Sequence, residues 1–124
     1  MKSIVTLALL SALLTSCAAA VVGVIGVTGG YLFVNGQLKE TVPAPLPAVH
    51  AAVKSSFIAL GFHETREVAD KLKGKLQAEM ADGTRIYIWL KATDMDQTEV
   101  SIRVGYMGDR ELSIQILKQI KSRL

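Results

Sequence analysis

Three segments between residues 73 and 104 alternate apolar and polar side chains with a period of two, and this pattern constrains the fold most strongly. Successive side chains of a β-strand point to opposite faces, so each segment is predicted to be a strand with one apolar face. Asp82-Gly83 is a tight-turn dipeptide, and a polar loop is predicted at residues 93–97. The apolar positions are Gly74, Leu76, Ala78 and Met80, then Ile86, Ile88 and Leu90, then Val100, Ile102 and Val104.

Two predicted helices can cover this apolar face. In the first, residues 46–60, Pro47 suits the first turn and Gly61 suits the C-terminal cap. In the second, Asp109 is predicted to cap the N-terminus, and Glu111 in the first turn complements the helix dipole. The predicted buried positions are Val49, Ala52, Val53, Phe57, Ala59 and Leu60 in the first helix, and Leu112, Ile116, Leu117, Ile120 and Leu124 in the second.

Two shorter segments complete the predicted sheet. Residues 37–42 place Leu38 and Val42 on one face, and residues 62–68 form a second segment with poor alternation. The order is therefore strand, helix, four strands, helix. This order predicts an α+β fold, a two-layer sandwich in which two helices lie on one face of an antiparallel sheet of four to five strands. Residues 36–124 have the length of one small domain.

The first sixteen residues have the pattern of a secretory signal peptide. Lys2 gives a positive start, and residues 4–14 form a mostly apolar core. The following Leu14-Thr15-Ser16-Cys17 resembles the bacterial lipobox, which implies cleavage before Cys17 and lipidation of its thiol. The alternative is a buried structural cysteine at the end of a signal anchor.

Lipidation of Cys17 would give a membrane-anchored protein of the bacterial cell envelope. Each buried CH₂ contributes about 0.8 kcal/mol, so two or three acyl chains hold a protein firmly on a bilayer. Ala18 follows the cysteine in place of Asp. By resemblance to Gram-negative lipoproteins, this residue implies the outer membrane, with the domain facing the periplasm.

The domain is predicted to be preceded by a lipidated cysteine and an apolar, glycine-rich tether or membrane-associated segment, residues 17–35. Residues 18–34 carry no charge and fall slightly short of the ~20 residues that a membrane-spanning helix needs. Three interpretations stay open: a membrane-associated helix that forms homo-oligomers, an extended segment packed on the domain, and a loosely ordered tether. Close helix contact would use two small-xxx-small pairs, Ala19 with Gly23 and Gly26 with Gly30.

The charge balance and the polar residue types exclude several function classes. The formal net charge is only +3, with basic and acidic residues interleaved, so nucleic acid is not a predicted partner. Ser55 and His50 share a predicted helix without a third triad member, and His63 lies too far from His50 to share a metal. Asp94 and Asp96 lack the rest of a calcium loop. We therefore expect a protein that is not an enzyme and that uses no metal or cofactor.

Strand alternation places the sole tryptophan among basic residues on the sheet face opposite the apolar stripe. Such a face can bind an anionic or glycan surface, or a partner protein. The alternatives are a solvated face with favourable cross-strand pairs, or a face that the tether covers. The candidate binding residues are Lys75, Arg85, Tyr87, Trp89, Lys91 and Arg103.

Several short motifs occur together along the chain. They are the lipobox with its glycine-rich continuation, Gly-Gln-Leu-Lys at 36–39, Asp-Gly-Thr at 82–84, and Thr-Glu-Val-Ser-Ile-Arg-Val-Gly at 98–105 followed by the Gly-Asp helix start. Taken together, these motifs resemble the domain-of-unknown-function 3568 family of small bacterial lipoproteins. The likeness covers nearly the whole chain. It implies an exported lipoprotein with a small α+β domain, and it supplies no catalytic residues.

Two functions are therefore expected from the sequence. The first is a lipid-anchored envelope protein that binds a protein or an envelope polymer through its sheet face. The second is an oligomer-forming or membrane-associated structural lipoprotein that acts through residues 18–34.

Overall fold

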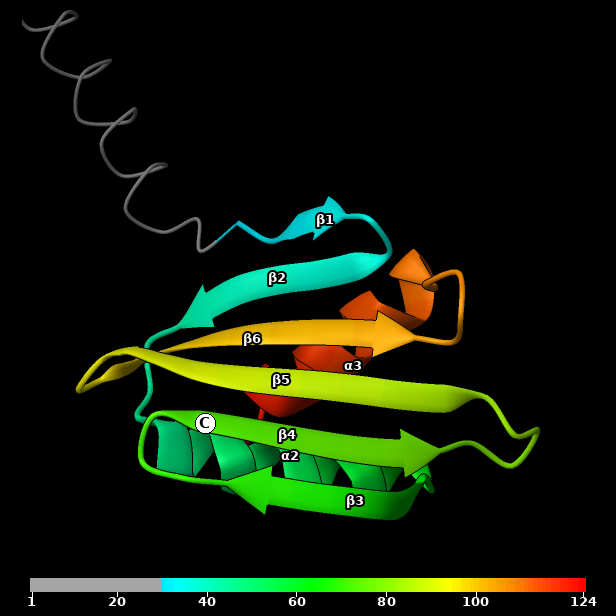
Figure 1. Ribbon diagram of the computed structural model, residues 1–124, viewed down its shortest axis with the longest axis horizontal. Helices are drawn as coiled ribbons and strands as arrows, with labels where there is room; N and C mark the ends of the chain where they lie inside the picture. The colour runs from blue at the N-terminus through cyan, green and yellow to red at the C-terminus, as the bar shows by residue number, and fades with distance from the viewer. Residues whose placement is uncertain (1–29) are drawn as a thin grey trace, which may run out of the picture.

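The computed structural model describes residues 30–124, which form an antiparallel sheet and two helices (Figure 1). The strand order is β1-β2-β6-β5-β4-β3, and every neighbouring pair is antiparallel. The predicted α+β class is thus confirmed. The elements are β1 (Leu32–Val34), β2 (Gln37–Val42), α2 (Leu46–Leu60), β3 (His63–Ala69), β4 (Lys73–Glu79), β5 (Arg85–Asp94), β6 (Gln97–Val104) and α3 (Arg110–Lys121).

The sheet has six strands, so the prediction of four to five was wrong. The additional strand, β1, lies within the stretch predicted as the tether and pairs with β2 across Asn35-Gly36. These two residues have φ values of 54° and 80°, as a two-residue type I′ hairpin turn requires. Asn-Gly is a strong hairpin signal, and the prediction overlooked it because the residues before it were assigned to the tether.

The predicted loop at residues 93–97 was also wrong in extent. Asp94 pairs with Gln97, so only Met95 and Asp96 lie between strands β5 and β6. The polar side chains here reflect exposure to solvent rather than the end of the strand ladder. The weakly alternating segment 62–68 does form a strand, β3, and a register shift between Glu64 and Arg66 explains its irregular pattern.

Helix α2 has the predicted bounds, and helix α3 begins after the predicted cap Asp109 but ends at Lys121, before Leu124. Helix α2 has a proline in its first turn, and Gly61 at its C-cap adopts a left-handed conformation with φ 73°. At the start of α3, the Asp109 side chain accepts a hydrogen bond from the backbone N–H of Leu112 at 3.0 Å. Such an N-cap stabilises a helix by about 1 kcal/mol, because it satisfies a donor that has no partner within the helix.

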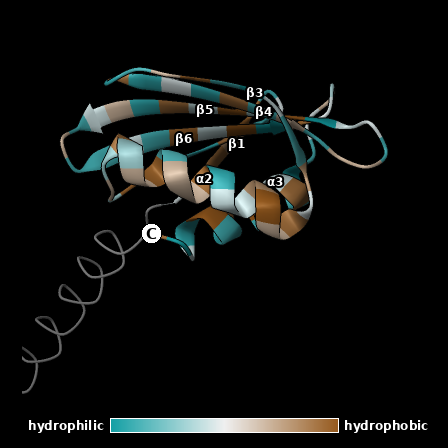
Figure 2. Cartoon of the chain, turned by 90° about the horizontal axis from the view of Figure 1, so that it is seen from below, coloured by the Kyte–Doolittle hydropathy of each residue, from teal (hydrophilic) through white to brown (hydrophobic). Residues whose placement is uncertain are grey.

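Both helices pack on one face of the sheet and bury its apolar stripe (Figure 2). Among the predicted core positions, Ala59 and Leu124 are exposed instead. Ala59 lies on the far side of α2 from Phe57, and Leu124 lies beyond the end of α3. The largest fully buried side chains are Phe57, Leu38, Leu76, Ile86, Ile88, Leu90, Ile102, Ile116, Ile120, Val42, Val49 and Val53.

One charged residue lies inside this core layer. Glu40 is on the same face of β2 as Leu38 and Val42, and its side chain is only 2 % exposed. Lys121 at the end of α3 donates to its Oε1 at 2.9 Å, whereas Oε2 is buried without a hydrogen-bond partner among residues 30–124. This ion pair could not be predicted from the sequence, because 81 positions separate the two residues.

The predicted signal peptide at residues 1–16, the predicted lipidation site Cys17 and the small residues Ala19, Gly23 and Gly26 lie outside the described residues. Gly30 is the first described residue, and it is exposed. No helix within residues 30–124 is long and apolar enough to cross a membrane.

Candidate binding face

The face of the sheet opposite the helices, here called the outer face, is defined by four rows of side chains that lie directly opposite one another across the strands. Strand pairing fixes which residues share a row, since paired residues project to the same side. The rows are His63, Glu79 and Arg85; Arg103, Tyr87, Gln77 and Arg66; Lys39, Ser101, Trp89, Lys75 and Val68; and Thr41, Glu99, Lys91 and Lys73.

Positive charge is concentrated on the outer face. The chain has 14 basic and 11 acidic residues, and of these only Lys2 precedes residue 30, so the described residues carry 13 and 11. The four rows hold seven basic residues against only Glu79 and Glu99, a formal charge of +5, which leaves six basic and nine acidic residues elsewhere. Within residues 30–124, none of these seven cations has a carboxylate at ion-pair distance.

Two aromatic rings stand at the centre of this charged face. Tyr87 and Trp89 are two residues apart on β5 and therefore project from the same side. Their ring centroids are 5.9 Å apart with an interplanar angle of 15°, so the rings are stacked. Lys75, directly opposite Trp89 on β4, holds its Nζ 5.9 Å from the Trp89 centroid, within cation–π range.

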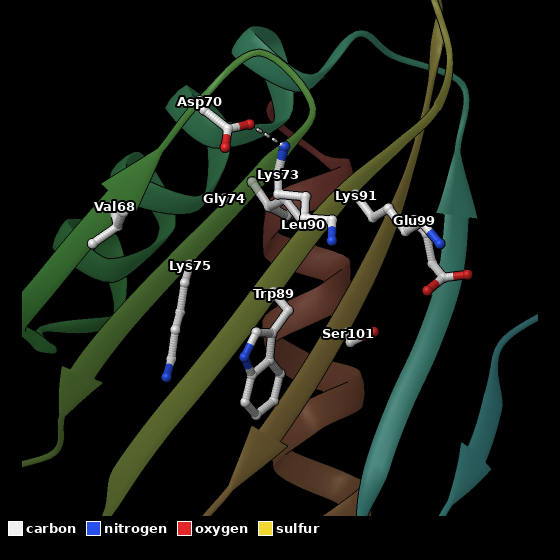
Figure 3. Close-up of a pocket in the computed structure, with 10 residues that line it drawn as sticks. All are labelled: Val68, Asp70, Lys73, Gly74, Lys75, Trp89, Leu90, Lys91, Glu99 and Ser101. Atoms are coloured by element: carbon white, nitrogen blue, oxygen red, sulfur yellow. Dashed lines mark hydrogen bonds between the residues drawn. The ribbon is translucent and has the colours of Figure 1, made fainter.

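Two adjoining hollows lie on the outer face and share Lys75 and Trp89. The first, of about 360 Å³, is drawn in Figure 3, where Lys75, Trp89 and Lys91 project from the strands on the side away from the helices. The second has about 620 Å³. The first is lined by Val68, Asp70, Lys73, Gly74, Lys75, Trp89, Leu90, Lys91, Glu99 and Ser101, and the second by Lys75, Gly83, Thr84, Arg85, Tyr87, Trp89, Arg103, Gly105 and Tyr106.

The two hollows differ in their charges. The second contains only basic ionisable side chains besides its tyrosines. The first combines lysines with the carboxylates of Asp70 and Glu99. Asp70 accepts hydrogen bonds at 2.8 Å from the backbone N–H groups of Leu72 and Lys73, and these lower the pKa of its carboxyl below the ordinary value. The first hollow therefore offers acceptors beside its donors.

Arg103 fixes one wall of the second hollow. Its guanidinium donates to the backbone carbonyl of Asn35 at 3.3 Å and to that of Tyr106, so it joins the β1–β2 turn to the loop before α3. The two segments lie so close together that a Cβ added at Gly108 would stand 2.5 Å from Gly36 Cα. Glycine is required here by space as well as by its positive φ of 84°.

All six predicted binding residues lie on the outer face. Five of them line the second hollow and three line the first. The prediction missed Tyr106, whose side chain is 91 % exposed at the rim of the second hollow. It also missed Lys73, Ser101 and Val68 in the first hollow. Alternation within β4 and β6 placed Lys73 and Ser101 on this face, but only the register shows that they neighbour Lys91 and Trp89.

The residues considered above for catalysis or metal binding do not gather on the outer face. His50 Nε2 lies 3.0 Å from Glu67 Oε1 on the helix side, at ion-pair distance but without the alignment of a hydrogen bond. Lys54 donates to the same carboxylate at 2.7 Å, which raises the pKa of Lys54 and lowers that of Glu67. Within residues 30–124, no three His, Cys, Asp or Glu side chains gather to hold a metal ion.

The fold and this face define a class of protein, a small α+β sandwich with a basic and aromatic outer sheet. The particular family follows from a comparison with family models. The model described as "Protein of unknown function (DUF3568)" matches residues 1–123, so the chain belongs to this family, and the resemblance seen in the sequence is confirmed. No curated protein matches the chain.

Proposed function

We propose that this protein is a non-enzymatic, lipid-anchored protein of the bacterial cell envelope that binds an anionic envelope polymer or protein through its outer face. The observation that carries the proposal is the concentration of seven cations on the face that holds Trp89 and Tyr87, none of them with a carboxylate at ion-pair distance within residues 30–124, although the described chain is nearly neutral. An anionic partner would be drawn to this face and would contact aromatic rings there.

Electrostatics at close range supports an anionic partner. Neighbouring strands lie about 4.8 Å apart, well within the Debye length of about 8 Å at physiological salt, so cations in adjacent strands repel one another. Lys73 and Lys91 are directly opposite, an arrangement that destabilises a sheet. A bound anion would relieve this repulsion.

The test uses the full-length chain in mild detergent and a matched pair of double variants. Lys75→Gln/Arg85→Gln removes two charges from the outer face, and Lys118→Gln/Arg123→Gln removes two exposed charges elsewhere. Binding to purified envelope fractions should weaken at least tenfold for the first variant and stay within twofold for the second. Equal losses would refute the outer face as the binding surface.

The proposed anchor is the lipidated Cys17 in the outer membrane, with the domain facing the periplasm. Its support is the lipobox-like Leu14-Thr15-Ser16-Cys17 with Ala18 after it. Cys17→Ala should release the protein from membranes, and mass spectrometry of the wild-type N-terminal peptide should find diacylglycerol on the thiol. A Cys17→Ala protein that sediments with membranes as strongly as wild type would contradict the anchor.

A second candidate function is self-association or membrane association through residues 18–34. Apolar side chains exposed on β1 favour it, since Leu32 is 67 % and Val34 56 % exposed. Leucine at both Gly26 and Gly30 would block close helix contact. The variant should then lose crosslinked oligomers from membranes, and an unchanged oligomer yield would remove this candidate.

A further inference from the structure

We propose that the ligand of the outer face is an acidic glycan, which stacks a sugar ring on Trp89, places an acidic group in the second hollow and places hydroxyl groups in the first. This inference rests on the proposed function, because it names the chemical class of the anionic partner. Three features carry it: an aromatic centre, a purely cationic hollow beside it, and a hollow of mixed charge on its other side.

The aromatic centre suits a ring-shaped ligand. Trp89 lines both hollows, and its stacking against Tyr87 holds the two rings nearly parallel. The face of an aromatic ring carries negative charge, and it attracts the slightly positive C–H groups of a sugar ring. Volumes of about 360 and 620 Å³ lie in the ~300–1,000 Å³ range of small-ligand sites. Each hollow can therefore accept a unit of a polymer.

The second hollow suits the acidic group. Lys75, Arg85 and Arg103 line it without any acidic side chain. Arg103 is held in place by two backbone carbonyls, so its charge is positioned before a ligand arrives. A carboxylate, sulfate or phosphate on a sugar would gain charge-assisted hydrogen bonds from these groups.

The first hollow argues against a polyanion that carries no hydroxyl groups. Its Asp70 and Glu99 carboxylates would repel such a chain, but they can accept hydrogen bonds from sugar hydroxyls. Lys73 and Lys91 can donate to hydroxyl oxygens in the same hollow. A glycan whose units carry both acids and hydroxyls matches the two hollows together, whereas an acidic peptide matches only the second.

The sole tryptophan reports directly on binding, since ligand contact at Trp89 changes its fluorescence. Full-length protein in mild detergent is titrated with polygalacturonate, polyglutamate and dextran, with EDTA present to keep trace calcium from gelling the polygalacturonate. We expect polygalacturonate to bind at least tenfold more tightly than polyglutamate at equal charge concentration, and dextran to bind more weakly than polygalacturonate. Polyglutamate binding as tightly as polygalacturonate would overturn the proposal.

Two variants read the separate features. Trp89→Leu, followed by light scattering or sedimentation, should weaken polygalacturonate binding about tenfold, which corresponds to about 1.4 kcal/mol, and should leave polyglutamate within twofold. Glu99→Val should strengthen polyglutamate more than polygalacturonate, because it removes a charge that repels both polymers and an acceptor that only the hydroxyl groups of polygalacturonate can use. Circular dichroism checks that both variants fold. An equal change in affinity for both polymers in Glu99→Val would contradict the role given to the first hollow.

The outcomes separate this inference from the proposed function. If Lys75→Gln/Arg85→Gln weakens both polymers equally and Trp89→Leu weakens neither, the ligand is an anion of another class and the glycan assignment is wrong. If the wild-type protein binds no polyanion and no envelope fraction, both the assignment and the proposed function fail.

Discussion

The ion pair between Glu40 and Lys121 gives an unusual stability prediction, because its two members lie in different environments. The Glu40 side chain is 2 % exposed, whereas the Lys121 side chain is 47 % exposed. Lys121→Met would leave a buried carboxylate without the one side chain in the described part of the protein that pairs with it. Removing one member of a buried pair costs about 3–5 kcal/mol, and partial access of water from the lysine side reduces our expectation to about 2–3 kcal/mol.

The opposite substitution should be far less harmful. Glu40→Leu removes a carboxylate whose Oε2 has no hydrogen-bond partner, and it leaves a lysine that can turn its ammonium to water. We therefore expect a change within about 1 kcal/mol, in either direction. The double variant should be at least as stable as wild type, because apolar replacements of buried ion pairs are often neutral or stabilising.

Urea unfolding of the four proteins, followed by Trp89 fluorescence and circular dichroism, measures this asymmetry. Lys118→Met, an exposed lysine on the same helix, controls for changes in helix propensity and net charge. A Lys121→Met protein within 0.5 kcal/mol of wild type, a limit near the error of such extrapolations, would refute the argument. A larger loss for Glu40→Leu than for Lys121→Met would refute it as well.

Three further predictions concern a close contact between two glycines, a pair of like charges, and stability at low pH. Gly108→Ala should lower the urea midpoint strongly, because its Cβ would meet the backbone of Gly36 at 2.5 Å. Gly61 also has a positive φ, but a Cβ added there would meet no atom within 4 Å, so Gly61→Ala should cost only about 1 kcal/mol. Lys73→Thr should raise stability by a few tenths of a kcal/mol at low salt, since it removes the repulsion with Lys91, and the gain should shrink at high salt. The backbone N–H of Thr84 lowers the pKa of Asp82 below its ordinary 3.8. The contribution of Asp82 to folding stability is therefore complete above about pH 4 and is lost as the pH falls through the folded-state pKa. Asp82→Asn should flatten the acid end of the stability profile measured by urea unfolding.

Local sequence signals located most of the fold. Capping residues and apolar periodicity predicted the bounds of helix α2, and they predicted that Asp109 caps the N-terminus of α3. The wrong predictions had local causes too. Strand β1 was not predicted, because an apolar stretch without charge suits a tether as well as a strand. The end of β5 was assigned to a loop, because polar residues suit a loop as well as an exposed strand. In both cases the composition fitted a strand and an irregular segment equally well, and only the backbone hydrogen bonds between strands show that the segment is a strand.

The candidate binding face was only partly within reach of the sequence. Alternation fixed which side of each strand a residue occupies, so the six predicted members lie together as expected. The rest depended on which strands are neighbours. Lys39 on β2 and Arg66 on β3 are basic residues of the same face, yet each lies far along the chain from Trp89.

By itself, the sequence determined the properties that depend on near neighbours: the alternating strands, the amphipathic helices, their caps, and the signal-like start that ends in Cys17. Tertiary structure alone decided how charge is distributed. Basic and acidic residues are interleaved along the chain, but antiparallel pairing collects seven cations on the outer face, and the packing of α3 on the sheet places Lys121 beside Glu40. The physical reason is that hydrogen-bonded ladders join residues distant in sequence, so their register sets which charges meet.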